Sequence, residues 1–169
     1  MKWTVALLPL LFATASHADE ATAIRRVGLG YKIGNGIGFT GADVIINPMP
    51  HLVLDLHSAY FTLETVNDTS TGFALAPAIQ GELRAQGSTP YAAVGLQYVH
   101  ISVGEVTASG KGFFANLGYE WKWPSGLGIL LGGGIQHLNE IEAHDATHAI
   151  KTGGKTAPNL EFGVRYMFF

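Results

Sequence analysis

Hydrophobic and polar residues alternate along most of the chain with a period of two, which is the pattern of β-strands. Near the end of the chain, Leu160, Phe162 and Val164 alternate with Glu161 and Arg165. Turn-forming residues divide such runs into eight predicted strands, at 24–33, 37–46, 52–64, 72–84, 90–103, 112–123, 126–138 and 157–169. Each run has about the 9–11 residues with which a tilted strand crosses a bilayer, or slightly more. The pattern predicts an all-β fold, an eight-stranded antiparallel up-and-down transmembrane β-barrel.

The predicted connections between the strands alternate in length. Tight turns containing Pro or Gly follow the second, fourth and sixth strands, whereas longer polar stretches follow the third, fifth and seventh. The last polar stretch runs from Asn139 to about Thr156. Short turns at one end and longer loops at the other are typical of outer-membrane barrels. Pro77 falls inside the fourth predicted strand, where its missing backbone donor predicts a bulge or a local break.

The composition indicates which face of the barrel is apolar. The chain is 47% hydrophobic and only 14% charged, whereas a soluble surface is about 25–35% charged. We therefore expect apolar side chains outside and polar side chains in the lumen. The predicted charged residues of the lumen are Arg26, Lys32, Asp43, Asp55, Glu82, Arg84, Glu120, Lys122, Glu161 and Arg165. Because buried charges need partners and side chains fill an eight-stranded interior, this balanced set predicts a plugged polar lumen with no open channel.

Aromatic residues gather near the predicted strand ends, as they do in the two interfacial belts of membrane barrels. The predicted interface aromatics are Tyr60, Phe73, Tyr91, Phe113, Trp121, Trp123, Tyr166 and Phe168.

The N-terminus has the features of a secretory signal peptide. Lys2 precedes an apolar run from Val5 to Phe12, and the sequence up to Ala18 fits a small-x-small cleavage site. We expect a signal peptide over residues 1–18 and a barrel domain over residues 19–169, exported to the outer membrane of a Gram-negative bacterium. The absence of cysteine excludes a disulfide scaffold. A net charge of −3 without a basic cluster excludes the electrostatic footprint of nucleic-acid binding.

The last ten residues alternate in polarity and end in Phe168 and Phe169. This segment resembles the terminal strand signal of bacterial outer-membrane proteins, from which it departs by one extra phenylalanine. With the signal peptide and the eight strands, the chain resembles the small eight-stranded outer-membrane β-barrel family, the type of the outer membrane protein A membrane domain and outer membrane protein X. The resemblance implies contact with outer-membrane lipid and lipopolysaccharide, and insertion by the barrel-assembly machinery. It implies no activity and no cofactor.

One short motif is a candidate for catalysis. His100 and Ser102 are similar to the His-x-Ser pair of the outer-membrane lipid A deacylases, and both have the outward parity of their strand. No acidic residue is placed to orient the histidine, as a catalytic triad requires. A polar pair near a strand end is the alternative interpretation.

The last predicted loop is rich in possible metal ligands, because His and carboxylate side chains suit zinc. They are His137, Glu140, Glu142, His144, Asp145 and His148. His144 and His148 are the candidate ligands, but nothing in the pattern fixes their spacing, and we favour a solvated polar loop without a metal.

We therefore expect a small structural or surface-exposed barrel of the outer membrane. Three alternatives remain open at this point: a lipid A-modifying enzyme using His100 and Ser102, a narrow conduit for small molecules, and a soluble lipocalin-like binder. The pattern does not identify a partner for the loops outside the cell.

Overall fold

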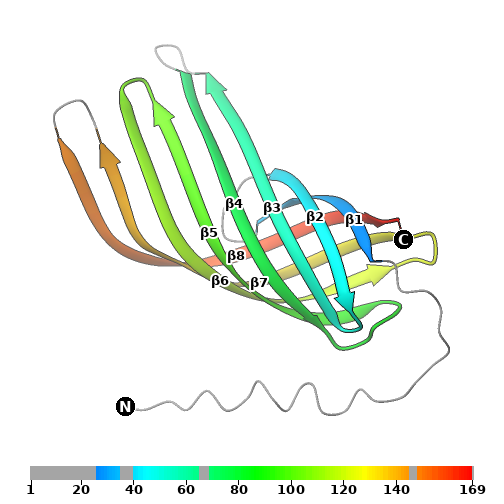
Figure 1. Cartoon of the computed structure of the whole chain (residues 1–169). Coiled ribbons are helices and arrows are strands. Elements are labelled where there is room, and N and C mark those ends of the chain that lie inside the picture. Colours follow the sequence, from blue (N-terminus) through cyan, green and yellow to red (C-terminus); the bar gives the residue numbers. More distant parts are fainter. Residues whose placement is uncertain (1–25, 35–39, 65–68, 145–147, 169) are drawn as a thin grey trace, which may run out of the picture.

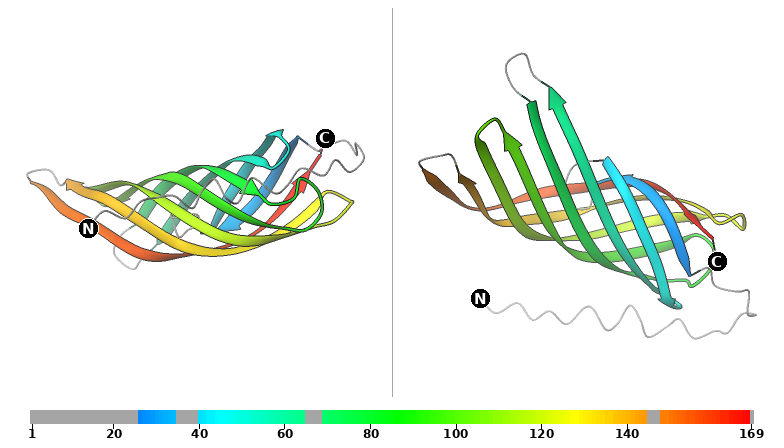
Figure 2. Two further views of the ribbon diagram at one scale, coloured as in Figure 1. Left: turned by 90° about the horizontal axis from the view of Figure 1, so that it is seen from below. Right: turned by 45° about the horizontal axis from the view of Figure 1, so that its top comes forward.

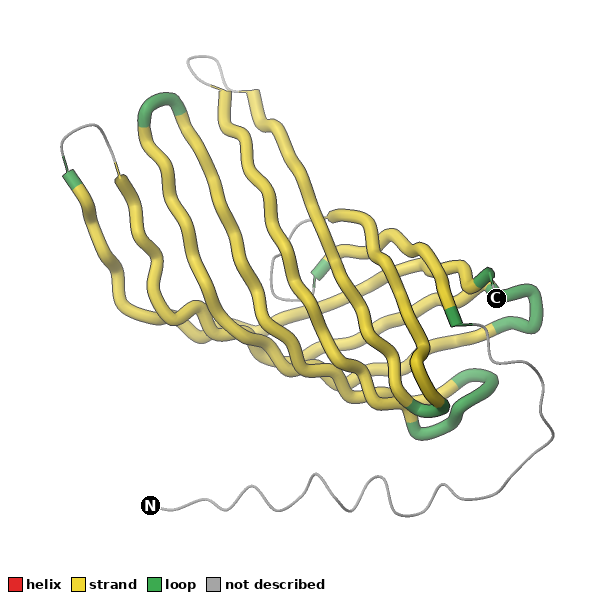
Figure 3. The backbone as a smooth tube through the Cα atoms, viewed as in Figure 1, coloured by secondary structure: helices red, strands yellow, loops and turns green. Residues whose placement is uncertain are grey.

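The chain forms one closed antiparallel ring of strands. A computed structural model describes residues 26–34, 40–64, 69–144 and 148–168 (Figure 1). Its strands are β1 (Val27–Ile33), β2 (Thr40–Met49), β3 (Leu52–Glu64), β4 (Thr69–Glu82), β5 (Thr89–Val103), β6 (Val106–Lys122), β7 (Leu127–His144) and β8 (Ala149–Met167). Each strand pairs with the next, and β1 pairs with β8 to close the ring. The predicted eight-stranded antiparallel up-and-down barrel is confirmed (Figure 3).

The described part of the chain contains no helix that is both long and apolar enough to cross a membrane. The predicted signal peptide, residues 1–18, lies outside the described residues.

The β2–β3, β4–β5 and β6–β7 connections lie at one end of the barrel, the short-turn end, beside the C-terminal end of β8 (Figure 1). At the opposite end, where a longer polar stretch is expected after the fifth strand, β5 and β6 are joined by a turn of Gly104 and Glu105 alone. The β2–β3 turn consists of Pro50 and His51, and His51 has a φ of 66°. The β6–β7 turn is tied to the chain end, because Met167 donates a backbone hydrogen bond to the Gly126 carbonyl over 2.9 Å. These are the tight turns that the Pro and Gly residues predict.

At the opposite end, the strands run further than the hydrophobic pattern indicates. The polar stretches 106–111, 139–144 and 149–156 were expected as loops, and this expectation is wrong, because all three belong to paired strands. β7 and β8 stay in register up to the pair of His144 with Ala149. A strand that meets water on both faces has no apolar alternation, so its sequence is polar like that of a loop.

The extended strands form a sheet that projects beyond the ring. β1 ends at Ile33 and β2 begins at Thr40, whereas β3 to β8 remain paired with their neighbours well past this level. Figure 2 shows the three long hairpins extending on this side. A bulge shifts the register of β6 and β7 between Lys111 and Gly112, and bulges bend a strand.

Side-chain burial in the ring is the reverse of that in a soluble protein. On β8, Phe162 and Tyr166 are 49% and 44% exposed, whereas Glu161 and Arg165 are each 3% exposed. Large exposed hydrophobic side chains occur on all eight strands. Charged groups are almost never fully buried unless they are paired, so each buried charge needs a partner in the polar interior.

Pro77 interrupts one ladder locally. The pairing of β4 with β5 skips Ala76 and Pro77, and the register is the same on both sides of the gap. Of the two forms of irregularity expected at Pro77, the structure has the local break and not the bulge.

Candidate functional site

The lumen contains a connected network of charged and amide side chains. At the short-turn end, Lys122 Nζ lies 2.5 Å from Glu82 Oε2. Gln80 Nε2 donates hydrogen bonds to Glu82 Oε1 over 3.1 Å and to Glu120 Oε2 over 3.3 Å. Arg165 Nη1 donates to the same Glu120 oxygen over 3.3 Å. These contacts join β4, β6 and β8 across the interior.

Towards the middle of the barrel, the network continues to β1, β2 and β3. Arg165 Nη2 lies 3.5 Å from Asp55 Oδ2. Lys32 Nζ forms an ion pair with Asp55 and lies 3.6 Å from Asp43 Oδ2. His57 Nδ1 and Asp43 Oδ1 are 2.7 Å apart. The network therefore connects side chains of β1, β2, β3, β4, β6 and β8 across the lumen.

A tyrosine joins the network from β5. The Tyr91 hydroxyl donates a hydrogen bond to Glu161 Oε1 on β8. The Tyr91 ring packs against two glycines, Gly118 and Gly132. A Cβ at either position would lie 2.4 Å from the nearest Tyr91 atom, so only glycine leaves room for the ring. On the loop side of this contact, Asn159 donates to Asn116 over 2.8 Å.

An apolar layer lies on the loop side of the polar network. Phe114 is 1% exposed and packs with four small residues of β3 and β4, which are Ala59, Ala74, Ala76 and Ala78. Gly95 makes room for the ring, because a Cβ at this position would lie 2.5 Å from Phe114 Cζ. The interior thus contains ion pairs at one level and a hydrocarbon cluster at another.

Most of the charged residues expected in the lumen lie there. Lys32, Asp43, Asp55, Glu82, Glu120, Glu161 and Arg165 are buried, and Lys122 is half-buried at the mouth. The expectation is wrong for Arg26 and Arg84, which are exposed. Arg26 precedes β1 and Arg84 follows β4, so both lie beyond the strand ends, where alternation does not imply burial.

These two corrections change the charge of the lumen. Three basic side chains, Lys32, Lys122 and Arg165, face five acidic ones, Asp43, Asp55, Glu82, Glu120 and Glu161. Instead of the expected equal numbers, acidic side chains outnumber basic ones among the charged residues placed in the lumen.

The predicted interface aromatics face outward with a single exception. The exposed ones are Tyr60, Phe73, Phe113, Trp121, Trp123, Tyr166 and Phe168. Tyr91 was wrongly assigned to this set, because it is buried in the lumen. It has the same parity on β5 as Ala93 and Gln97, which are also buried, and counting from the polar Gln97 would have placed it inside.

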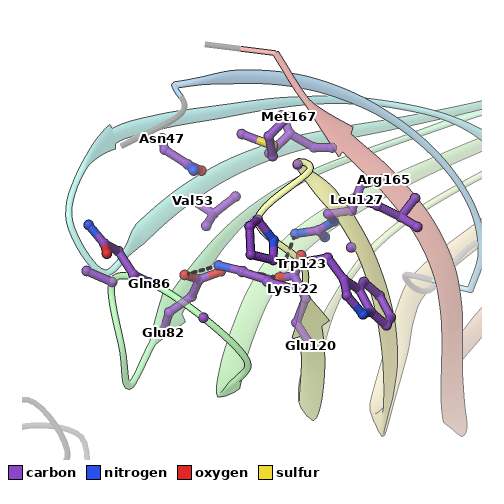
Figure 4. Close-up of a pocket in the computed structure, with 16 residues that line it drawn as sticks. Asn47, Val53, Glu82, Gln86, Glu120, Lys122, Trp123, Leu127, Arg165 and Met167 are labelled. Carbon is purple, nitrogen blue, oxygen red and sulfur yellow. Dashed lines mark hydrogen bonds and ion pairs between the residues drawn. The ribbon is translucent and has the colours of Figure 1, made fainter. Parts of the chain in front are cut away.

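A cavity of about 300 Å³ lies at the short-turn end of the lumen. Figure 4 shows Lys122 and Glu82 facing each other beside it, with Val53 and Met167 on the other side. Glu120 and Arg165 also line the cavity. The cavity therefore borders on the polar network, and that network separates it from the apolar layer around Phe114.

The candidate catalytic pair lies on β5, outside the lumen. Ser102 Oγ and His100 Nε2 are 3.4 Å apart. The His100 ring lies against Phe73, with 5.4 Å between ring centroids. Among the described residues, no carboxylate contacts His100. The structure thus brings the two residues together, but the part of the chain that it describes supplies no carboxylate to orient the histidine, which a triad needs.

The candidate metal ligands, His144 and His148, lie at the tip of the β7–β8 hairpin, where β7 ends and β8 begins. His144 ends β7 and His148 directly precedes β8, whereas Asp145 lies outside the described residues. Within the described ranges, no group of three or more His, Asp or Glu side chains is arranged to hold a metal ion.

The carboxylates beside these histidines have a basic partner. Lys151 Nζ forms an ion pair with Glu142 and lies 3.2 Å from Glu140 Oε1. The hydrogen bond from Lys151 lowers the pKa of the Glu142 carboxyl. The same contact raises the pKa of the Lys151 ammonium. This cluster is therefore an exposed ion-pair network on the projecting sheet.

Comparison with known proteins leaves the chain without a family assignment. No protein-family model matches it, and no curated protein matches it. Among solved structures, it is similar to Acinetobacter baumannii CarO2, with 13% sequence identity and a TM-score of 0.39, over 84% of this chain and 98% of that chain. A similarity at this level transfers no function to this chain.

Proposed function

We propose that the protein is a small integral β-barrel of the bacterial outer membrane, structural or surface-exposed, with a lumen closed by its own side chains. The observation that carries the proposal is the reversed burial of the ring. Large apolar side chains are exposed on all eight strands, while Lys32, Asp43 and Arg165 are at most 3% exposed. Soluble monomers rarely expose a continuous apolar patch beyond about 300–600 Å², so this surface requires a hydrocarbon environment.

The height of the apolar surface fits a membrane. On β4 and directly after it, the outward positions are Phe73, Leu75, Pro77, Ile79, Gly81 and Leu83. The ten steps from Phe73 to Leu83 measure about 33 Å along a strand at about 3.3 Å per residue. At a strand tilt of about 40°, this corresponds to roughly 25 Å across the membrane, the usual height of the apolar band of outer-membrane barrels.

Closure of the ring supports stability in a membrane. Lipid supplies no hydrogen-bonding partner, so each backbone donor and acceptor must be paired within the protein. The ring of paired strands from β1 to β8 meets this requirement, apart from the local break between β4 and β5 at Ala76 and Pro77. The projecting part of β3 to β8 carries polar side chains, and we infer that it lies in water outside the cell, available to an unidentified partner.

We expect the environment of the protein to follow from this assignment. Its wall contacts outer-membrane lipid and lipopolysaccharide, and the barrel-assembly machinery inserts it. No cofactor is needed for a structural role. The ion pairs of Arg165, Lys32 and Lys122 fill the lumen, which supports a barrel without an open channel.

Fractionation and gel electrophoresis test the proposal. The protein is expected in the outer-membrane fraction, and its unboiled form should migrate differently from the boiled form. In planar bilayers it should give no resolved openings. A soluble periplasmic protein with heat-insensitive migration would overturn the membrane assignment, whereas resolved single-channel openings would overturn the closed lumen and favour the conduit.

A further inference from the structure

The outer wall formed by β1 to β4 has a groove that the proposed function does not explain. It has a volume of about 540 Å³. Tyr31 and Tyr60 border it and are 61% and 73% exposed. Phe73 and Leu75 of β4 form another side of the groove.

The groove results from small residues between large ones. Tyr31, Ala42, Ser58 and Leu75 are successive neighbours across the four strands. The two central positions therefore carry small side chains, while both flanking positions carry large ones. In an adjacent row, Tyr60 pairs with Phe73, and the rings of both residues also line the groove. A wall of uniform side-chain size would have no such depression.

The chemistry of the groove suits hydrocarbon. Ser58 Oγ donates its hydrogen bond to the Ala42 carbonyl over 3.3 Å, so this hydroxyl is satisfied inside the wall. None of the described residues that line the groove is charged. The remaining surface consists mainly of aromatic faces, methyl groups and backbone.

The size of the groove and its surroundings indicate the occupant. A volume of about 540 Å³ equals roughly eighteen water-sized groups at about 30 Å³ each, which is of the order of one acyl chain. Leu29, Ile33, Val44 and Leu56 surround it on the same wall and are all exposed. The groove is thus continuous with the surface that the proposed function places in lipid.

We propose that this groove is a lipid-binding site that holds one hydrocarbon chain of a membrane diacyl lipid between Tyr31 and Tyr60. The inference rests on the proposed membrane location and adds a specific site to it. The rings supply large contact surfaces, and the small floor of Ala42 and Ser58 lets the chain lie close to the backbone. The bound lipid should therefore stay on the protein when the other lipids are removed.

Native mass spectrometry tests this proposal. The protein is refolded into vesicles of phosphatidylethanolamine and phosphatidylglycerol, extracted with detergent, and measured for retained lipid. Ala42→Trp fills the groove, and Ala115→Trp places the same side chain at an outward position of β6, outside the groove. Tyr31→Phe keeps the ring and removes its hydroxyl.

Wild type, Ala115→Trp and Tyr31→Phe should each retain one lipid. Ala42→Trp should lower the retained fraction by about tenfold, which corresponds to about 1.4 kcal/mol of binding. Heat-dependent gel migration of each variant shows that the barrel is folded and inserted.

Three results would overturn the lipid site. The first is an inserted wild-type barrel that retains no lipid, and the second is equal retention by Ala42→Trp and Ala115→Trp. The third is a wild-type dimer that dissociates only in Ala42→Trp, which would assign the groove to a second copy of the chain. A barrel that fails to enter the vesicles contradicts the proposed function itself and is distinguished by its unchanged migration on heating.

Discussion

Arg165 on β8 donates a hydrogen bond over 3.3 Å to the carboxylate of Glu120 on β6, although β7 lies between their strands. Gly128 of β7 is the register partner of Arg165. A Cβ at Gly128 would lie 2.9 Å from Glu120 Oε1 and 3.4 Å from Arg165 Cγ. The missing side chain of β7 thus provides the space in which charges from two non-adjacent strands meet.

Removing Arg165 should strongly destabilise the barrel. Arg165→Met leaves Glu120 and Asp55 without their guanidinium partner in the lumen, and breaking a buried ion pair costs about 3–5 kcal/mol. Urea unfolding from vesicles, followed by tryptophan fluorescence, measures the loss. The exposed Arg84 provides the matched control, since Arg84→Met should change the stability by less than about 0.5 kcal/mol.

A double-mutant cycle separates this pair from the rest of the network. If Glu120→Gln and Arg165→Met act on one contact, their effects should deviate from additivity by about 0.5–3 kcal/mol. Additive effects would contradict a direct interaction between the two residues.

The Tyr91–Glu161 contact should depend on a glycine. Gly132→Ala places a methyl group against the Tyr91 hydroxyl, and overpacking of this kind costs about 1–3 kcal/mol. Gly133, the next residue, faces outward, and a Cβ at this position would lie 3.3 Å from Cδ2 of the exposed Leu160 side chain, which can move aside. Gly133→Ala should therefore be tolerated in the same unfolding experiment, and equal effects of the two substitutions would argue against the assigned orientation of β7.

The projecting β7–β8 hairpin should respond to pH through Glu142 and Lys151. The folded-state pKa of Glu142 is lowered, so its stabilising contribution is present above the ordinary carboxyl pKa and is lost as the pH falls through the lowered value. The pKa of Lys151 is raised, so its contribution is lost only as the pH rises through that raised value. The ion pair is therefore complete at neutral pH.

Lys151→Met should return the pKa of Glu142 towards about 4.3, the ordinary value for glutamate. An NMR titration of the labelled glutamate carboxyl groups in micelles measures this change. Lys155→Met is the control, because Lys155 lies on the same strand and contacts no carboxylate among the described residues. A Glu142 titration that is unchanged in Lys151→Met would contradict the ion pair.

The enzymatic alternative predicts a different set of results. His100 and Ser102 lack an orienting carboxylate in the described structure. We therefore expect lipid A to have the same mass in cells that produce the wild type, His100→Ala or Ser102→Ala. Mass spectrometry of the extracted lipid A provides the measurement. Loss of an acyl chain with wild type, but not with either variant, would establish the deacylase-like activity instead.

Residue alternation predicted the ring well and the strand ends poorly. From Leu160 to Tyr166 of β8, large apolar residues alternate with polar or small ones, so the sequence alone assigns Phe162 to the wall and Arg165 to the lumen. Arg26 and Arg84 were misplaced because alternation has no meaning beyond a strand end. Tyr91 was misplaced because tyrosine suits both a membrane interface and a hydrogen-bonded interior.

The projecting sheet and the groove on the outer wall of β1 to β4 required three-dimensional information. Residues 139–144 and 149–156 are polar because both faces of their hairpin are solvated, which no sequence pattern distinguishes from a loop. The groove depends on Tyr31, Ala42, Ser58 and Leu75 being in one row. Their alignment follows from the strand register. Side-chain alternation excludes a shift of one residue but does not distinguish registers that differ by two.

The central claim is that the outward face of the ring meets lipid, and site-directed spin labelling tests it most directly. The chain has no cysteine, so single Cys substitutions at Leu160, Phe162 and Val164 can each carry one nitroxide in the vesicle-reconstituted protein. We predict frequent collisions of all three labels with oxygen, which dissolves in hydrocarbon, and few with a water-soluble nickel chelate. Frequent collisions with the nickel chelate at these positions would place the apolar wall in water and contradict the membrane-spanning barrel.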